Sequence, residues 1–187
     1  MAWLPNTTVP KTWTRARVVG VCALALLGLA GGLPGRANHL PQYQIKAGFI
    51  YNFAVLTNWP MDVGDILKLC VYGRDAFGAE LDALNKTVVG TRVLMVERKS
   101  DLESLKSCQL VYIPQAESPR TARILDLLRG LPILTIAESP GALAMGVMLN
   151  LRMANERITF EVNPGVARRV GLSFNAKLLR LASEVKP

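Results

Sequence analysis

Three short apolar runs constrain the fold of this chain more than any other feature. They cover residues 66–72, 108–113 and 131–136, and a glycine or proline lies at a boundary of each run. Predominantly apolar runs of this length are typical of strands buried on both faces of a sheet. Segments with helical spacing of apolar residues separate the runs, at residues 75–84 and 118–128. The order strand, helix, strand, helix, strand predicts a parallel α/β sheet.

The last third of the chain predicts two further strands. Residues 147–151 and 157–162 are joined by a short segment, and together they form a predicted antiparallel hairpin. Residues of the second strand alternate between two sides, with Ile158, Phe160 and Val162 on one and Arg157, Thr159 and Glu161 on the other. We therefore predict an α/β fold with three layers, in which a mainly parallel sheet is flanked by helices and carries a C-terminal antiparallel hairpin.

Helical segments precede and follow these strands. In residues 45–59 the apolar positions recur at three- and four-residue spacing, which predicts a helix with a broad apolar face packed on the core. Pro60 ends this helix, and the ring of Trp59 is expected to pin its end. After the hairpin, Asn163 and a proline at the first helical position predict a helical stripe that continues to Val185, with a break at Gly171 between two pieces.

The first 37 residues have the layout of a secretory signal peptide. A basic start with Lys11, Arg15 and Arg17 precedes an uncharged apolar run at residues 18–30, and small residues follow at 35–37. We expect the mature protein to begin near Asn38, so that residues 38–187 form a single exported domain. The alternative is a retained membrane anchor, although the run is short for a span of about 20 apolar residues.

Charge narrows the classes of partner. The formal net charge of the whole chain is +8, and the predicted leader carries four of these positive charges, which leaves +4 for the mature domain. A modest positive charge suits an acidic partner or a membrane surface, and it also serves simple solubility. Nucleic acid is not a predicted partner, because the Lys and Arg residues are scattered and have no aromatic platform among them.

The cysteines predict a disulfide. Of the three in the chain, Cys22 would leave with the leader, and Cys70 and Cys108 lie in or beside predicted strands. Two cysteines in an oxidising compartment normally pair, so we predict an intrachain disulfide between them. A regulatory redox switch and two free thiols are the alternatives. The absence of a C-x-x-C pattern gives no support to an oxidoreductase.

No motif in the sequence predicts catalysis. The only histidine is His39, at the start of the predicted mature chain, which argues against a histidine-based triad or a site with several histidine ligands. Phosphate-binding and dinucleotide-binding glycine patterns are also missing from the sequence. We therefore predict a protein that is not an enzyme, with no catalytic residue, no metal site and no cofactor.

The chain resembles the YfiR family of small periplasmic regulatory proteins from about Gln42 to Val185. Gly48 stands where the family usually has alanine, and residues 142–143 stand where it often has phenylalanine. The order and spacing of several blocks carry the resemblance: residues 46–60, 70–73, 89–96, 107–113, 134–136, 146–148, 157–163 and 178–182.

The resemblance implies a regulatory function. Members of the family resemble repressors that bind the periplasmic sensor domain of an inner-membrane diguanylate cyclase. Release of the repressor, through an outer-membrane lipoprotein or a redox signal, raises cyclic-di-GMP and promotes biofilm formation. The resemblance also implies a homodimer. The alternatives are a periplasmic module that binds a small molecule at the ends of the parallel strands, and an enzyme that needs neither histidine nor metal.

A repressor that works by occupancy needs an exposed contact surface. The polar side of the strand at residues 157–162 is the candidate, with Arg157 and Glu161 as the residues that would contact the partner. We expect both charges to project into solvent, so that reversing either one leaves folding nearly unchanged. The alternative interpretation is an ordinary solvated strand face.

Overall fold

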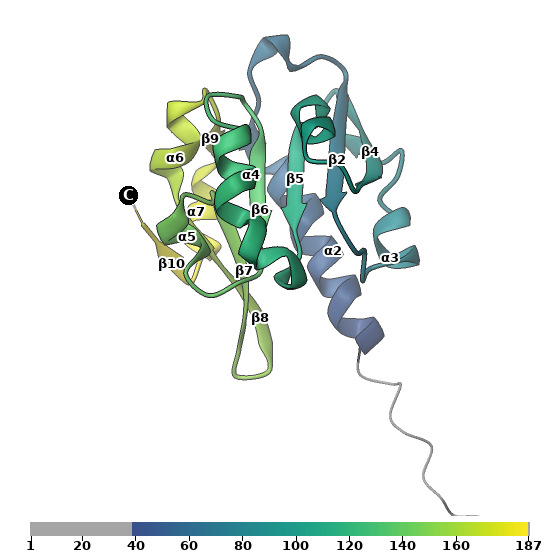
Figure 1. Ribbon diagram of the computed structural model, residues 1–187, viewed down its shortest axis with the longest axis vertical. Helices are drawn as coiled ribbons and strands as arrows, with labels where there is room; N and C mark the ends of the chain where they lie inside the picture. The colour runs from purple at the N-terminus through teal and green to yellow at the C-terminus, as the bar shows by residue number, and fades with distance from the viewer. Residues whose placement is uncertain (1–38, 187) are drawn as a thin grey trace, which may run out of the picture. The chain divides into compact units, whose positions relative to one another are not determined.

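Within residues 39–186, the computed structural model places an eight-stranded, mostly parallel sheet with helices packed against it (Figure 1). The strands are β2 (Ile66–Tyr72), β3 (Val88–Val89), β4 (Arg92–Lys99), β5 (Leu110–Ile113), β6 (Leu134–Ala137), β7 (Leu149–Ala154), β8 (Arg157–Val162) and β10 (Glu184–Val185). They lie in the order β10-β8-β7-β6-β5-β2-β4-β3 across the sheet.

The pairing confirms a mixed α/β fold with a mainly parallel sheet. From β4 through β2, β5 and β6 to β7 each neighbouring pair is parallel, and β10 is parallel to β8. Antiparallel pairing joins β3 to β4 and β7 to β8. The β7–β8 pair is not at the edge of the sheet, because β10 adds a further strand beside β8.

Helices and short helical turns connect and cover the strands. They are α2 (His39–Val55), η1 (Met61–Val63), α3 (Ala79–Asp82), η2 (Glu103–Ser107), η3 (Gln115–Arg120), α4 (Thr121–Leu127), α5 (Ala142–Met145), α6 (Pro164–Arg169) and α7 (Ala176–Leu181). A separate antiparallel pair is formed by β1 (Thr57–Asn58) and β9 (Ser173–Phe174). Among the described residues, no helix is both long enough and apolar enough to cross a membrane.

Alternate residues of the central strands belong to two hydrophobic clusters. In β2, Leu69 and Val71 join a cluster that includes α2, α3, α6 and α7. Cys70 and Tyr72 join a second cluster that includes residues of α4 and α5. Since successive side chains of a strand point to opposite faces, helices pack against both faces of the sheet. In Figure 1, α4 lies in front of the sheet and α2 behind it.

Helix α2 packs through its aromatic face but ends earlier than the sequence predicts. The rings of Phe53 and Phe160 meet edge to face, with centroids 5.0 Å apart. The helix ends at Val55 rather than near Pro60, because Thr57 and its neighbour take extended angles to pair with β9. Trp59 fixes this exit, as expected, since its indole Nε1 donates a hydrogen bond of 3.0 Å to the carbonyl of Ala54.

The C-terminal segment is less helical than predicted. Asn163 caps α6 as expected, with its side-chain oxygen accepting a hydrogen bond from the backbone N–H of Val166. The predicted stripe is then interrupted twice, since Phe174 lies in β9 and Val185 lies in β10. Backbone pairing decides both departures, because these residues extend to meet β1 and β8.

The structure contains a disulfide between Cys70 and Cys108. The bond spans 38 residues, and the two Cα atoms are 6.0 Å apart. Both residues are buried in the cluster on the α4 side of the sheet. The bond ties β2 to the segment that leads into β5, and these two strands are neighbours in the sheet.

Removing the disulfide is expected to destabilise the protein. For a loop of this length, the chain-entropy model assigns the bond about 4 kcal/mol. The variant Cys70→Ala/Cys108→Ala should therefore melt roughly 10 °C lower than the wild type in thermal unfolding without reductant. Reductant should lower the wild-type melting temperature toward that of the variant and leave the variant unchanged. Two free thiols in denatured, unreduced protein would contradict the assignment.

Candidate functional site

A buried ion pair lies at the edge of the sheet where the parallel strands end. Glu138 follows β6 directly, and its Oε2 atom lies 2.8 Å from Nζ of Lys46 on α2. The hydroxyl of Tyr112, in β5, donates a hydrogen bond of 2.6 Å to the same oxygen. Lys46 is only 7% exposed, so the pair interacts in surroundings where charges attract more strongly than in water.

Aromatic rings pack beside this pair. Nζ of Lys46 lies 5.0 Å from the ring centroid of Tyr43, within cation–π range. The ring of Phe77 meets both Tyr43 and Tyr112 edge to face. Burial, followed by the negative charge of Glu138, raises the pKa of Tyr112 well above its ordinary value. The phenol therefore keeps its proton and acts as the donor to Glu138.

The polar network continues across β7 and β8 through a buried amide. Asn150 is fully buried, and its side-chain Nδ2 donates hydrogen bonds to Oε2 of Glu161 at 2.9 Å and to the carbonyl of Ser139 at 3.0 Å. Its Oδ1 accepts a hydrogen bond from the backbone N–H of Ser139 at 3.1 Å. The guanidinium of Arg152 donates to Oε1 of Glu161 at 2.9 Å. Both carboxylate oxygens of Glu161 are thereby bound.

These contacts correct the expectation that Arg157 and Glu161 project into solvent together. The Glu161 side chain is only 13% exposed, because Asn150 lies opposite it in the β7–β8 register and Arg152 covers its other oxygen. Arg157 is exposed, as expected, and lies at the other end of β8. The two residues share a face of the strand but are separated by about 13 Å along it.

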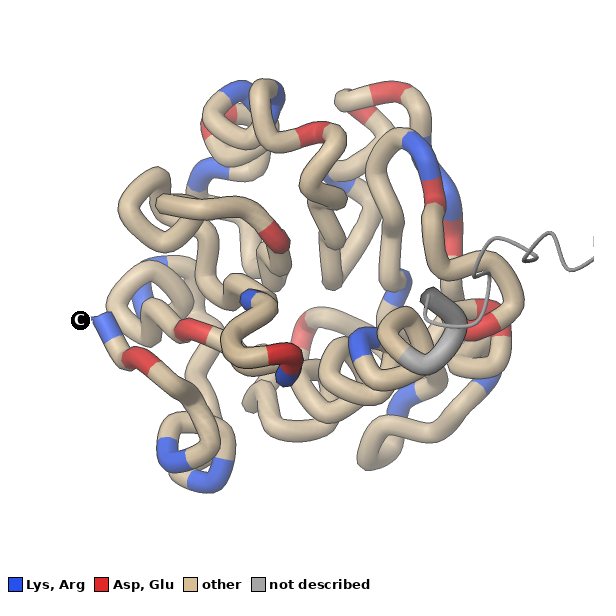
Figure 2. Tube along the Cα trace, turned by 90° about the horizontal axis from the view of Figure 1, so that it is seen from below, with Lys and Arg blue, Asp and Glu red and all other residues tan. Residues whose placement is uncertain are grey.

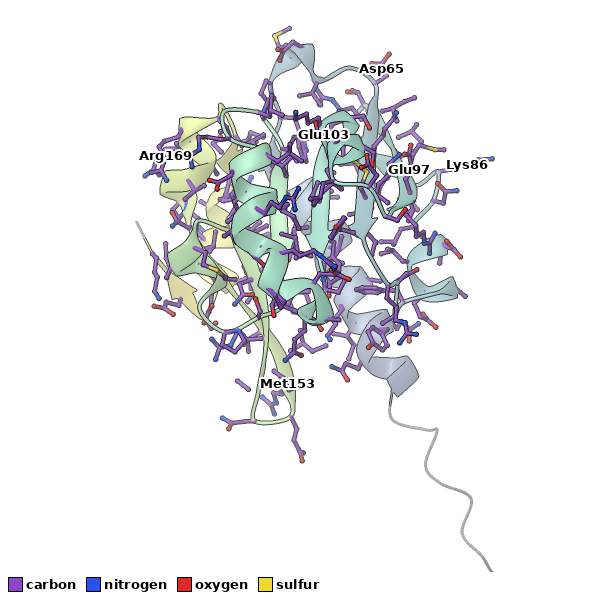
Figure 3. All side chains as sticks on the ribbon, in the orientation of Figure 1. Asp65, Lys86, Glu97, Glu103, Met153 and Arg169 are labelled. Carbon is purple, nitrogen blue, oxygen red and sulfur yellow. A yellow bond between two sulfur atoms is a disulfide. The ribbon has the colours of Figure 1, made fainter. Side chains whose placement is uncertain are left out.

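The turn between β7 and β8 is the most exposed part of this region. Asn155 and Glu156 form the two-residue connection and take positive φ angles of 49° and 60°, which match the twist of an antiparallel pair. Met153 is 51% exposed, and Arg157 is exposed on the opposite face of the hairpin. This connection extends past the other strands in Figure 1, and Met153 is labelled beside it in Figure 3.

A shallow hollow of about 270 Å³ opens at the same edge. It contains the charged groups of Lys46, Glu138 and Arg152, and each of the two cations is already paired with a carboxylate. Figure 2, which is viewed from this edge, shows positive and negative residues interspersed rather than gathered by sign. The predicted binding of a small ligand at the ends of the parallel strands stays a prediction.

Sequence reasoning did not identify Lys46, Tyr112 and Glu138 as a cluster. The available signal was positional, since Tyr112 lies near the end of a buried strand and Glu138 directly follows one. Lys46, by contrast, occurs within an apolar helical run, where a lysine is normally exposed. Within residues 39–186 no group of three or more His, Cys, Asp or Glu residues is placed to hold a metal ion.

Comparison with known proteins identifies the family. The model of the YfiR/HmsC-like family matches residues 43–183, and the chain belongs to that family. At the level of the family, membership implies a periplasmic regulatory protein. The fold is similar to the crystal structure of a conserved domain protein from Vibrio cholerae O1 biovar El Tor, with a TM-score of 0.51 and 9% identity. That match covers 77% of this chain and 60% of the length of the solved chain.

The buried ion pair is expected to stabilise α2 against the sheet. Replacing Glu138 with Gln leaves Lys46 buried without a counter-charge, which should lower the free energy of unfolding by about 3 kcal/mol. The double variant Lys46→Met/Glu138→Gln should recover part of that loss in urea unfolding, because the buried cation is then removed.

The matched control is an exposed ion pair. Lys106 and Glu103 are joined at 2.8 Å near the surface, so Glu103→Gln should cost less than about 1 kcal/mol. The single variants Lys46→Met and Glu138→Gln each lower the free energy of unfolding by some amount. If these two amounts simply add in the double variant, the pair does not stabilise the fold.

Proposed function

We propose that this protein binds and represses an inner-membrane diguanylate cyclase from the periplasm, and so controls cyclic-di-GMP and biofilm formation. The match of the YfiR/HmsC-like family over residues 43–183 is the observation that carries the proposal. The protein would act by occupancy: while bound, it holds the cyclase's periplasmic domain in its inactive state. Its release, through an outer-membrane lipoprotein or another signal, would let the cyclase produce cyclic-di-GMP.

Export is part of this proposal. The protein would be secreted through a signal peptide spanning residues 1–37, with the mature chain beginning near Asn38. These residues lie outside the part of the chain that the structure describes. The disulfide supports the proposed compartment, because such bonds form and persist in oxidising surroundings.

The exposed turn between β7 and β8 is the contact surface we favour. Arg157 brings a positive charge to one face of the hairpin, which suits an acidic partner surface, and Met153 is an exposed apolar side chain on the other face. The base of the turn is held by Asn150, Arg152 and Glu161, so little order has to be gained on binding. An ordinary solvated strand end is the competing interpretation, and the variants below separate the two.

Charge reversal at Arg157 tests this surface. Arg157→Glu should change the free energy of unfolding by less than about 0.5 kcal/mol, since the side chain is exposed. It should weaken binding to the cyclase's periplasmic domain at least about tenfold and raise cyclic-di-GMP in the cell. Arg123→Glu, at an exposed position of α4, is the matched control and should leave both unchanged.

The outcomes separate the function from the choice of surface. Normal cyclic-di-GMP after deletion of the whole gene would contradict the repressor proposal. Wild-type binding by Arg157→Glu would contradict only the assignment of the turn. Glu161 is a poorer probe than the sequence suggests, because its reversal also removes the hydrogen-bonding partner of Asn150 and Arg152.

We also propose that the protein works as a homodimer. Closed two-fold pairs are the commonest soluble oligomers, and the family resemblance points the same way. Light scattering at micromolar concentration should report twice the mass of one mature chain. A single-chain mass that persists as the concentration is raised would contradict this proposal.

A further inference from the structure

A second hollow lies between α4 and α6, at the boundary of the two hydrophobic clusters. Its volume is about 510 Å³, within the range of small-molecule pockets in proteins. Its walls come from α4, the loop that follows it, the end of α5 and the outward side of α6, and β6 contributes to its floor. It shares no lining residue with the hollow at the carboxyl ends of the strands.

The interior of this hollow is mostly apolar and recessed. Leu128, Ile133 and Met148 are buried at its floor, whereas Val166 and Val170 are half-buried along its walls. Among its lining residues only Met145 belongs to the large apolar side chains that are exposed in the described part of the chain. The apolar surface therefore lies inside a recess. An inserted chain can reach it more readily than a flat protein surface can.

The floor offers little to a polar ligand. Its one buried hydroxyl belongs to Thr135, whose Oγ1 accepts a hydrogen bond of 3.1 Å from the backbone N–H of Met148. An alkyl chain needs no hydrogen bond and gains free energy from leaving water, by about 0.8 kcal/mol for each buried CH₂ group. Met145 and Met148 add flexible thioether side chains that adapt to the shape of such a ligand.

The mouth of the hollow is positively charged. Its charged lining residues are Arg129, Arg169 and Asp126, of which Asp126 already pairs with Arg129. The side chain of Arg169 forms no ion pair or hydrogen bond with another of residues 39–186, and it lies in the last turn of α6. Figure 3 labels Arg169 on that helix. A ligand with a negatively charged head would therefore meet an uncompensated guanidinium at the entrance.

We propose that this hollow binds an amphiphilic carboxylate, a molecule with an alkyl chain and one anionic head. The chain lies against Leu128, Ile133 and Met148, and the carboxylate pairs with Arg169. This inference does not rest on the proposed repression of a cyclase, since it concerns a different face and a different kind of ligand.

Calorimetric titration of the purified protein tests the proposal. The probes are sodium decanoate, decan-1-ol, which has the chain without the charge, and sodium acetate, which has the charge without the chain. Decanoate should bind at one saturable site, decan-1-ol about tenfold more weakly, and acetate not at all. Absence of saturable decanoate binding, or equal binding of decanoate and decan-1-ol, would overturn it.

Two variants locate the head group. Arg169→Gln should weaken decanoate about tenfold and leave decan-1-ol unchanged, because only the charged head loses its partner. Arg168→Gln is the matched control, since Arg168 is exposed in the same helical turn but does not line the hollow. Equal weakening by both variants would mean a general charge effect and would overturn the assignment of Arg169.

A third variant locates the chain. Ala122 is exposed on α4 and lines the hollow, so Ala122→Trp should fill the space and abolish binding of both decanoate and decan-1-ol. Circular dichroism of each variant checks that it is folded before titration. Wild-type binding by folded Ala122→Trp would place the ligand elsewhere and overturn the proposal. If Ala122→Trp does not fold, the comparison of Arg169→Gln with Arg168→Gln decides the outcome.

Discussion

Each central strand packs its alternate residues into two hydrophobic clusters, one on each face of the sheet. The rest of this structure depends on that constraint. In β2, Leu69 packs on the α2 side of the sheet and Cys70 on the α4 side, and β5 and β6 divide their residues in the same way. A polar side chain inside such a strand loses water on either face, at a cost of a few kcal/mol unless it finds a partner. Polar residues therefore collect at strand ends, and the carboxyl ends of β5 and β6 meet at one edge.

At that edge the largely buried charges are satisfied within the protein. Glu138 accepts from Lys46 and from Tyr112, so one carboxylate joins α2 to β5 and β6. Asn150 then connects the backbone after β6 to Glu161 on β8. What remains for a partner is the turn beyond this network, where Arg157 is exposed. A hydrogen-bonded network that supports an exposed, charged turn suits the binding of a partner protein. It does not have the form of a catalytic pocket.

The sequence predicts the strands better than the ends of the helices. Continuous apolar runs mark β2, β5 and β6, and alternation marks β8, because burial on two faces or one face leaves a direct trace in residue type. The predicted helix at residues 75–84 shrinks to α3, where Gly78 adopts a positive φ of 53° that ordinary helices do not contain. Strands of two residues, such as β9 and β10, leave no periodic signal, since tertiary pairing alone makes them extended.

The candidate site is predicted only in part for the same reason. The pairing of Cys70 with Cys108 follows from compartment and strand position, and Arg157 is exposed as strand alternation predicts. Alternation places Glu161 on the polar face but gives no information on what covers it. Its cover depends on the register of β7, which sets Asn150 opposite it. Lys46 is hidden in an apolar helical run, and its partner is 92 residues away in the chain.

The position of the disulfide bears on how a regulator of this kind would be released. Cys108 precedes β5, whereas Tyr112 and Glu138 of the polar network lie near the carboxyl ends of β5 and β6. Both sulfur-bearing residues are at most 1% exposed, and thiol exchange requires a thiolate to reach a sulfur atom. Reduction therefore needs the core to open first, which would loosen β2 and β5 as a whole rather than switch one surface. A partner that competes for the exposed turn meets no such barrier. The geometry thus favours release by competition over release by redox chemistry, with the disulfide acting as a brace for the fold.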